Sequence, residues 1–203
     1  MVDSYHLRHA MVCASNVNRS MAAHALLKTE GLDVESYGVG NTVKLPGASP
    51  ASPNRYPFGT PYSHILADLT AKNKSLYSDN GLLTMMDRNQ GVKIAPQRWQ
   101  DRSAESTPLD IVISFESKVF DIVVQDLRRR EVSGISSGCH PCLVINLEVR
   151  DSTLDAAQAA PHALLLCKLL EESEDWETEV ESVLDSFVEQ TKRKRPEYDV
   201  CFS

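Results

Sequence analysis

Residues 11–20, MVCASNVNRS, end an apolar stretch with a cysteine and place an arginine six positions after it. The residues up to Cys13 have the composition of a buried strand, and those from Ser20 onward have the pattern of a helix. The residues between them, 14–19, therefore form a strand-to-helix turn. A strand followed by such a turn and a helix is the first unit of an α/β sheet. Ligands of parallel α/β sheets bind at the edge where such strands end, so this turn is a candidate ligand site.

The rest of the chain repeats the alternation of strands and helices. Two later segments, LDIVISF and CLVINLEV, are nearly continuous apolar runs, which are typical of strands buried on both faces. The expected strands are residues 6–13, 33–39, 109–115 and 142–149. The expected helices are residues 20–30, 62–73, 117–131, 155–171 and 175–193. This order predicts a three-layer, doubly wound α/β fold, with a mainly parallel sheet of four to five strands and helices on both faces.

Composition and charge narrow the class of protein. The 203 residues, 42% of them hydrophobic, are expected to form one domain, residues 1–203. No apolar run is long enough to span a bilayer and the first residues lack the apolar segment of a signal peptide, so we expect an intracellular protein without a membrane partner. The formal net charge of −7 argues against direct nucleic-acid binding. Five scattered cysteines do not suggest a disulfide framework.

One segment interrupts the alternation. Residues 45–62, LPGASPASPNRYPFGTPY, carry five prolines, which a central strand or a helix interior does not tolerate. The segment is predicted to be a long loop. A functional loop and a poorly ordered linker both remain open.

The turn after Cys13 has the properties of a phosphate-binding loop. Its small and turn-tolerant residues let successive backbone N–H groups converge on one point, and the start of the following helix adds partial positive charge. The expected phosphate-binding residues are Ala14, Ser15, Asn16, Val17, Asn18 and Arg19.

A thiol at the centre of such a loop suits nucleophilic attack on phosphorus. Backbone donors and Arg19 favour the thiolate form of Cys13, and the guanidinium can hold two phosphoryl oxygens. Ser20 is placed to donate to the thiolate when it leaves. The competing interpretation of Cys13 is a small buried hydrophobe that closes a strand.

Expulsion of a serine or threonine oxygen also requires a general acid at the same edge of the sheet. Asp151 follows the fourth apolar strand and is the first candidate, with Glu148 and Asp155 as competitors. Asp110 begins a strand, so it should lie at the opposite edge.

Four segments carry a family resemblance: VCASNVNRSMAAH, YGVGNTVKLPG, LYSDNGLLTMMDRN and VINLEVRD. Together they resemble the Ssu72-type family of RNA polymerase II carboxy-terminal-domain phosphatases, which act with the pre-mRNA cleavage and polyadenylation machinery. The resemblance spans nearly the whole chain. It implies a nuclear enzyme of mRNA 3′-end processing and transcription termination, on an elaborated low-molecular-weight tyrosine phosphatase fold with small accessory substrate-binding elements.

The resemblance also implies roles for individual residues. Cys13 is then the nucleophile, Arg19 the phosphate clamp and Asp151 the general acid. The substrate is the phosphoserine at the fifth position of the polymerase heptad repeat, held with its following proline in cis. The groove residues that the resemblance implies are Lys44, Leu45, Pro46, Leu83 and Met86. Without the resemblance, the segments VKLPG and LLTMM would be interpreted as turn and core.

Two other functions remain open. An arsenate reductase on the same fold would need a relay of thiols near the loop. A non-catalytic scaffold of the polyadenylation complex could use an apolar stripe on residues 175–193, although such stripes usually face the protein's own core. The family binds a scaffold protein of that complex. The CHPC segment at 139–142 lacks enough ligands for a structural zinc site, and no metal or organic cofactor is expected.

Overall fold

The computed structural model describes residues 6–103, 105–133 and 140–203. Within these residues, a five-stranded sheet has the order β2-β1-β5-β6-β7. Its strands are β1 (His9–Cys13), β2 (Val34–Gly38), β5 (Ile111–Ser114), β6 (Pro141–Asn146) and β7 (Glu197–Phe202). The first four run parallel to one another, and β7 runs antiparallel to β6 along one edge. The predicted mainly parallel sheet is confirmed.

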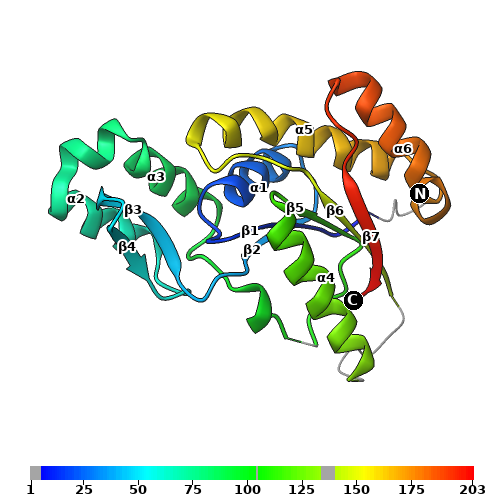
Figure 1. Cartoon of the computed structure of the whole chain (residues 1–203), viewed down its shortest axis with the longest axis horizontal. Helices are drawn as coiled ribbons and strands as arrows, with labels where there is room; N and C mark the ends of the chain where they lie inside the picture. The colour runs from blue at the N-terminus through cyan, green and yellow to red at the C-terminus, as the bar shows by residue number, and fades with distance from the viewer. Residues whose placement is uncertain (1–5, 104, 134–139) are drawn as a thin grey trace.

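Helices cover both faces of this sheet, as predicted (Figure 1). One face is covered by α1 (Arg19–Thr29), α5 (Thr153–Glu171) and α6 (Trp176–Thr191), and the other by α4 (Ser117–Val132). Successive strand residues point to opposite faces. Met11 and Ile113 accordingly pack toward α1 and α5, whereas Val12 and Val112 pack toward α4.

The apolar stripe of α6 belongs to the core. All five of its members are buried in the cluster that joins the sheet to α1 and α5: Trp176, Val180, Val183, Leu184 and Phe187. The stripe therefore supports the fold and offers no free surface to a scaffold partner.

A smaller lobe lies beside the sheet (Figure 1). It consists of β3 (Val43–Ser49), β4 (Ser52–Tyr56), α2 (Tyr62–Asp79) and α3 (Leu82–Val92). These elements share a separate apolar cluster, to which Val17 and Met21 also contribute. The lobe thus packs directly against the loop after β1.

The prediction of one long loop over 45–62 was wrong for residues 45–56, which belong to β3, β4 and the turn between them. β3 and β4 pair as an antiparallel hairpin whose register shifts between Leu45 and Ser49. Prolines are tolerated there because both strands of a two-stranded sheet are edge strands.

The helices of the lobe also differ from expectation. The predicted helix over 62–73 ends at Asn73, and this residue is non-helical in the structure, with φ −165° and ψ 88°. The helix resumes after Asn73 and continues to Asp79. The helix α3 was missed. It begins after Gly81, whose φ of 79° makes the left-handed turn that separates it from α2.

Among the described residues, none of the helices is long and apolar enough to cross a lipid bilayer.

Candidate active site

The loop between β1 and α1 is organised around the buried side chain of Asn16. This residue adopts a left-handed conformation with φ 54°, which asparagine tolerates better than most residues. Its Nδ2 donates to Ser20 Oγ at 3.1 Å and to Ser36 Oγ at 3.0 Å. Its Oδ1 accepts from the backbone N–H of Gln97 at 2.9 Å, and its carbonyl accepts from the Tyr62 hydroxyl at 2.5 Å. The loop is therefore fixed from several sides.

Cys13 lies at the floor of a cavity of about 270 Å³. The residue is only 3% exposed, and its Sγ is 3.0 Å from Ser20 Oγ. The structure thus brings together Cys13 and Ser20, as the sequence predicted. The other residues that line the cavity are Ser15, Val17, Asn18, Lys44, Leu45, Pro46, Asn80, Leu82, Met85, Asp151, Ser152 and Thr153.

The Arg19 guanidinium is anchored beside this cavity. Nη1 donates to the carbonyls of Phe115 and Val149, at 3.1 and 3.0 Å, and Nη2 pairs with Glu116 Oε2 at 2.8 Å. Burial by itself lowers the pKa of Arg19, but Asp151, Cys13 and Glu116 outweigh it and raise the pKa. The arginine is therefore a permanent cation, and its buried Nε has no hydrogen-bond partner.

Asp151 is the carboxylate that reaches the cavity. Its side chain is 59% exposed, its Oδ1 is 3.4 Å from Arg19 Nε, and it accepts a hydrogen bond from Asn18 Nδ2 at 2.9 Å. Glu148 instead accepts from the backbone N–H of Ser117, at the start of α4. Asp155 hydrogen-bonds with Ser152 at the start of α5. Neither competitor lines the cavity.

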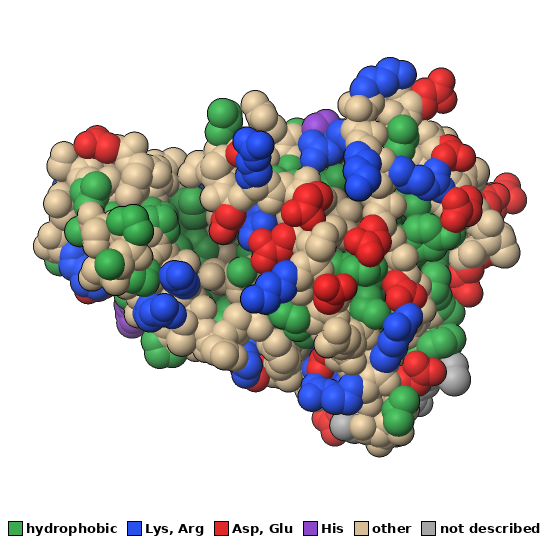
Figure 2. All heavy atoms as spheres, in the orientation of Figure 1, with side chains coloured by type: hydrophobic (Ala, Val, Ile, Leu, Met, Phe, Trp, Pro, Cys, Tyr) green, Lys and Arg blue, Asp and Glu red, His purple; other side chains and the backbone are tan. Residues whose placement is uncertain are grey.

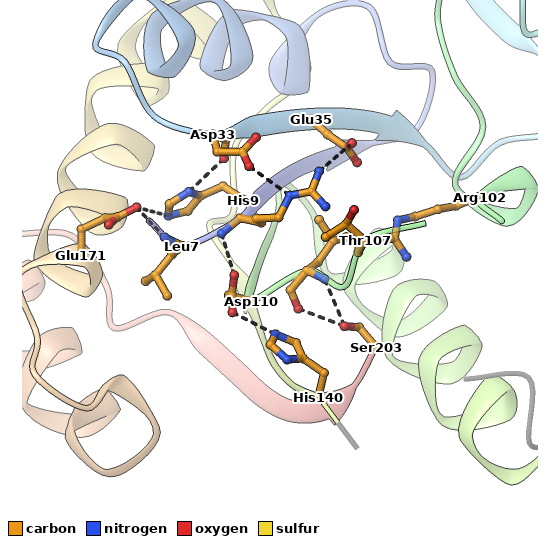
Figure 3. Close-up of polar contacts among 12 residues, drawn as sticks. Leu7, His9, Asp33, Glu35, Arg102, Thr107, Asp110, His140, Glu171 and Ser203 are labelled. Atoms are coloured by element: carbon orange, nitrogen blue, oxygen red, sulfur yellow. Dashed lines mark hydrogen bonds and ion pairs between the residues drawn. The ribbon is translucent and has the colours of Figure 1, made fainter. Parts of the chain in front are cut away.

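Asp110 lies at the opposite edge of the sheet, as expected (Figure 3). Its carboxylate accepts from the backbone N–H of Arg8 at 2.6 Å and pairs with His140 Nε2 at 2.9 Å. The same edge holds His9, whose Nδ1 is 3.2 Å from the Asp33 carbonyl. These side chains tie the strand beginnings together, far from Cys13 in the fold.

The expected groove residues are only partly the ones that line the cavity. Lys44, Leu45 and Pro46 of β3 do so. Leu83 and Met86 do not: Met86 is fully buried in the lobe's core, and the wall is formed by Leu82 and Met85. Because adjacent helix residues point about 100° apart, a shift of one position exchanges a core side chain for a cavity side chain.

The surface view agrees with this arrangement. Figure 2 shows hydrophobic side chains gathered where the lobe meets the main body, whereas basic and acidic side chains are intermixed elsewhere on this face. The cavity thus combines an apolar wall with the polar loop at its floor.

The remaining cysteines of the described segments lie in the core. Cys142 and Cys201 are buried on paired strands, and Cys167 is buried in α5. Burial raises the pKa of all three thiols, that of Cys201 to about 11. Cys139, the first cysteine of the CHPC segment, lies outside the described residues. Within those residues, no group of three or more His, Cys, Asp or Glu could hold a metal ion.

Comparison with known proteins places this geometry in context. The Ssu72-like protein family matches residues 7–203. The RNA polymerase II C-terminal domain phosphatase ssup-72 of Caenorhabditis elegans is 42% identical over 203 residues, which cover 100% of both chains.

Two solved structures from Drosophila melanogaster are similar along nearly the whole chain. One is a serine phosphatase of the RNA polymerase II CTD of the SSU72 superfamily, with a TM-score of 0.89 and 38% identity, covering 97% of this chain and 100% of that chain. The other is Ssu72 with Symplekin, bound to a cis peptidomimetic CTD peptide that is phosphorylated on the serine at position 5. Its TM-score is 0.85 at 35% identity, covering 97% of this chain and 98% of that chain.

Proposed function

Because this chain belongs to the Ssu72-like protein family, we propose that it is a cysteine-dependent phosphatase of the RNA polymerase II carboxy-terminal domain. Its substrate is the phosphoserine at the fifth position of the heptad repeat. The observation that carries the proposal is that Cys13 and Asp151 line one cavity, with Arg19 Nε 3.4 Å from Asp151 Oδ1. The likeness to the Ssu72 structure with a CTD phosphoserine peptide supports this substrate.

The first chemical step transfers the phosphoryl group to Cys13. The thiolate forms an S–P bond while the P–O bond to the substrate serine breaks, and the protonated carboxyl of Asp151 gives its proton to the leaving oxygen. The Nε–H of Arg19 makes no hydrogen bond in the protein and can donate to a phosphoryl oxygen, while the loop N–H groups hold the others.

The second step releases phosphate. Asp151, now a carboxylate, takes a proton from water as the water attacks phosphorus and the S–P bond breaks. Ser20 Oγ, 3.0 Å from Cys13 Sγ, donates to the departing thiolate. The thiol–hydroxyl pair therefore serves the step in which negative charge returns to sulfur. The chemistry requires neither a metal nor an organic cofactor.

The cavity wall suits a peptide in which proline follows phosphoserine. Leu45 and Pro46 come from β3, and Leu82 and Met85 from α3. Together they offer an apolar surface beside the phosphate-binding loop, which a proline ring can contact. We assign these four residues, with Lys44, to substrate binding.

Partners and location follow from the same proposal. A Symplekin-type scaffold protein is a proposed partner, since a similar chain is seen with Symplekin. Action on the polymerase in transcription termination and mRNA 3′-end processing implies a nuclear location. The arsenate reductase alternative is not favoured, because Cys13 is the one cysteine that lines the cavity within the described residues.

The test is phosphate release from a two-heptad peptide that carries the phosphoserine before proline. Cys13→Ser should release none, because it removes the nucleophile. Asp151→Asn should be slowed by about 10²–10⁴-fold on the peptide. It should be slowed far less on p-nitrophenyl phosphate, whose leaving group needs no proton. Equal release by the wild type and both variants would refute the mechanism, and no release by the wild type would favour a scaffold role.

A further inference from the structure

Two cationic side chains lie behind the phosphate-binding loop and do not line the cavity. Arg88 in α3 donates from Nη2 to the carbonyls of Val17 and Asn18, at 2.9 and 3.4 Å. Lys93, just after α3, donates from Nζ to the Ser36 carbonyl at 2.6 Å and to Gln97 Oε1 at 2.8 Å. Both cations therefore contact protein groups that shape the loop or its support.

The contacts of Lys93 lead to the loop in two steps. Its ammonium holds the side chain of Gln97, and the backbone N–H of Gln97 donates to Asn16 Oδ1 at 2.9 Å. It also holds the carbonyl of Ser36, whose hydroxyl accepts from Asn16 Nδ2 at 3.0 Å. Lys93 thus contacts two of the three residues that orient the Asn16 amide.

Burial makes the charged form of the Lys93 side chain energetically unfavourable. Burial lowers the pKa of Lys93 to about 7, and the charges of Glu35 and Cys13 act in the opposite direction. Burial likewise lowers the pKa of Arg88, again opposed by Cys13. A cation placed behind the loop attracts an anion that is held in the loop.

Charged and titratable groups from two elements, β2 and α1, lie near Lys93. From β2, Glu35 faces it as an anion and the ring of Tyr37 lies 5.7 Å from Nζ. From α1, His24 and Lys28 are the nearby titratable groups, and Lys93 is one of the causes that lower the pKa of His24. Burial is the largest cause that lowers the pKa of His24 to about 4, and the charges of Lys93 and Lys28 add to it. His24 is therefore neutral near pH 7 and adds no second positive charge beside Lys93.

We propose that Lys93 is a positioning residue for the phosphatase reaction, with Arg88 in a supporting part. Its charge, placed behind the loop, holds Asn16 in the anion-binding arrangement and favours the Cys13 thiolate. Arg88 binds carbonyl oxygens of the loop, so that these point away from the bound anion. The inference concerns the site of the proposed function, but its test does not depend on the polymerase as substrate.

The test measures alkylation of Cys13 by iodoacetamide against pH, read by mass spectrometry of the Cys13 peptide. Lys93→Gln removes the charge and keeps a hydrogen-bond donor. We expect it to move the midpoint of the profile upward by about one pH unit, the lower end of the effect of a nearby opposite charge. Lys93→Arg should restore the wild-type midpoint. Lys28→Met is the matched control, because Lys28 also donates to a backbone carbonyl, that of Val92, but at the surface.

Several outcomes separate the possibilities. An unchanged midpoint in Lys93→Gln would overturn the proposal, as would an equal shift in Lys93→Arg. A shift in Lys28→Met as large as that in Lys93→Gln would also overturn it, because the loss of any nearby lysine charge would then have the same effect. If Lys93→Gln does not fold, by circular dichroism, Lys93→Met carries the same test. A shifted midpoint in an enzyme inactive on the heptad peptide would uphold this inference and refute the proposed function.

Discussion

The amide of Asn16 connects α1, β2 and the segment after α3 at the centre of the site. Its three side-chain hydrogen bonds satisfy the Ser20 and Ser36 hydroxyls and the Gln97 N–H, and the side chain is fully buried. Buried polar groups that lose their partners destabilise a protein strongly. The stability of the loop should therefore depend on this one residue.

At this scale we predict that Asn16→Ala lowers the free energy of unfolding by about 2–4 kcal/mol, because it leaves polar groups unpaired and places alanine at a left-handed position. Urea denaturation followed by tryptophan fluorescence measures the change. Asn41→Ala is the control, since Asn41 is exposed and accepts a single hydrogen bond from Arg98. Equal losses in the two variants would contradict the role given to Asn16.

At the scale of elements, the β3–β4 hairpin determines where the substrate wall stands. Asn54 Nδ2 donates to the Pro46 carbonyl at 2.8 Å and also contacts the Tyr77 hydroxyl at 3.0 Å, which ties the hairpin to α2. Gly47 lies against the opposite strand: a Cβ there would stand 1.8 Å from the Ser52 carbonyl oxygen. A side chain at Gly47 must therefore push the two strands apart.

We accordingly predict that Gly47→Ala lowers kcat/KM on the heptad phosphopeptide by about tenfold to a hundredfold, because Pro46 moves out of place. Hydrolysis of p-nitrophenyl phosphate, which does not need the peptide wall, should stay near the wild-type rate. Gly91→Ala serves as the control, because a Cβ at Gly91 meets nothing within 4 Å. Parallel losses on both substrates would show that the hairpin supports the whole site and not the peptide wall alone.

At the scale of the whole molecule, buried histidines make stability depend on pH. Burial lowers the pKa of His9 at one edge of the sheet and that of His24, to about 4, behind the phosphate-binding loop. Below pH 6.5 these histidines are protonated in the unfolded chain but remain neutral in the folded chain until the pH approaches their lowered pKa. The stability linked to His24 is thus complete above pH 6.5 and is lost progressively as the pH falls to about 4.

We predict that the free energy of unfolding of the wild type falls by up to about 3 kcal/mol over this window on account of His24. His24→Gln should flatten the slope by close to one proton, measured by urea denaturation at a series of pH values. His64→Gln, at an exposed position of α2, is the matched control. An unaltered slope in His24→Gln would show that His24 is not the group responsible.

The main sheet was predictable because its elements carry strong local patterns. The apolar run at 109–115 contains β5, and the run at 142–149 contains all of β6 but its first residue; the alternation with helices implied a parallel arrangement. The accessory lobe was not predictable in the same way, because the residue patterns of a proline-rich hairpin and of a short helix indicate secondary structure only weakly. Their stability comes from packing against α2 and against the loop after Cys13.

The sequence by itself determined the strand–loop–helix unit from Cys13 to Ser20, because its spacing and turn-tolerant residues are local properties. Only the tertiary structure decided which distant groups meet that unit. Asp151 lies 3.4 Å from Arg19 while Glu148 turns to α4, and Lys93 approaches the loop from behind. Such choices depend on how separate elements pack and on how deeply each charge is buried, and neither property is present in a local pattern of residues.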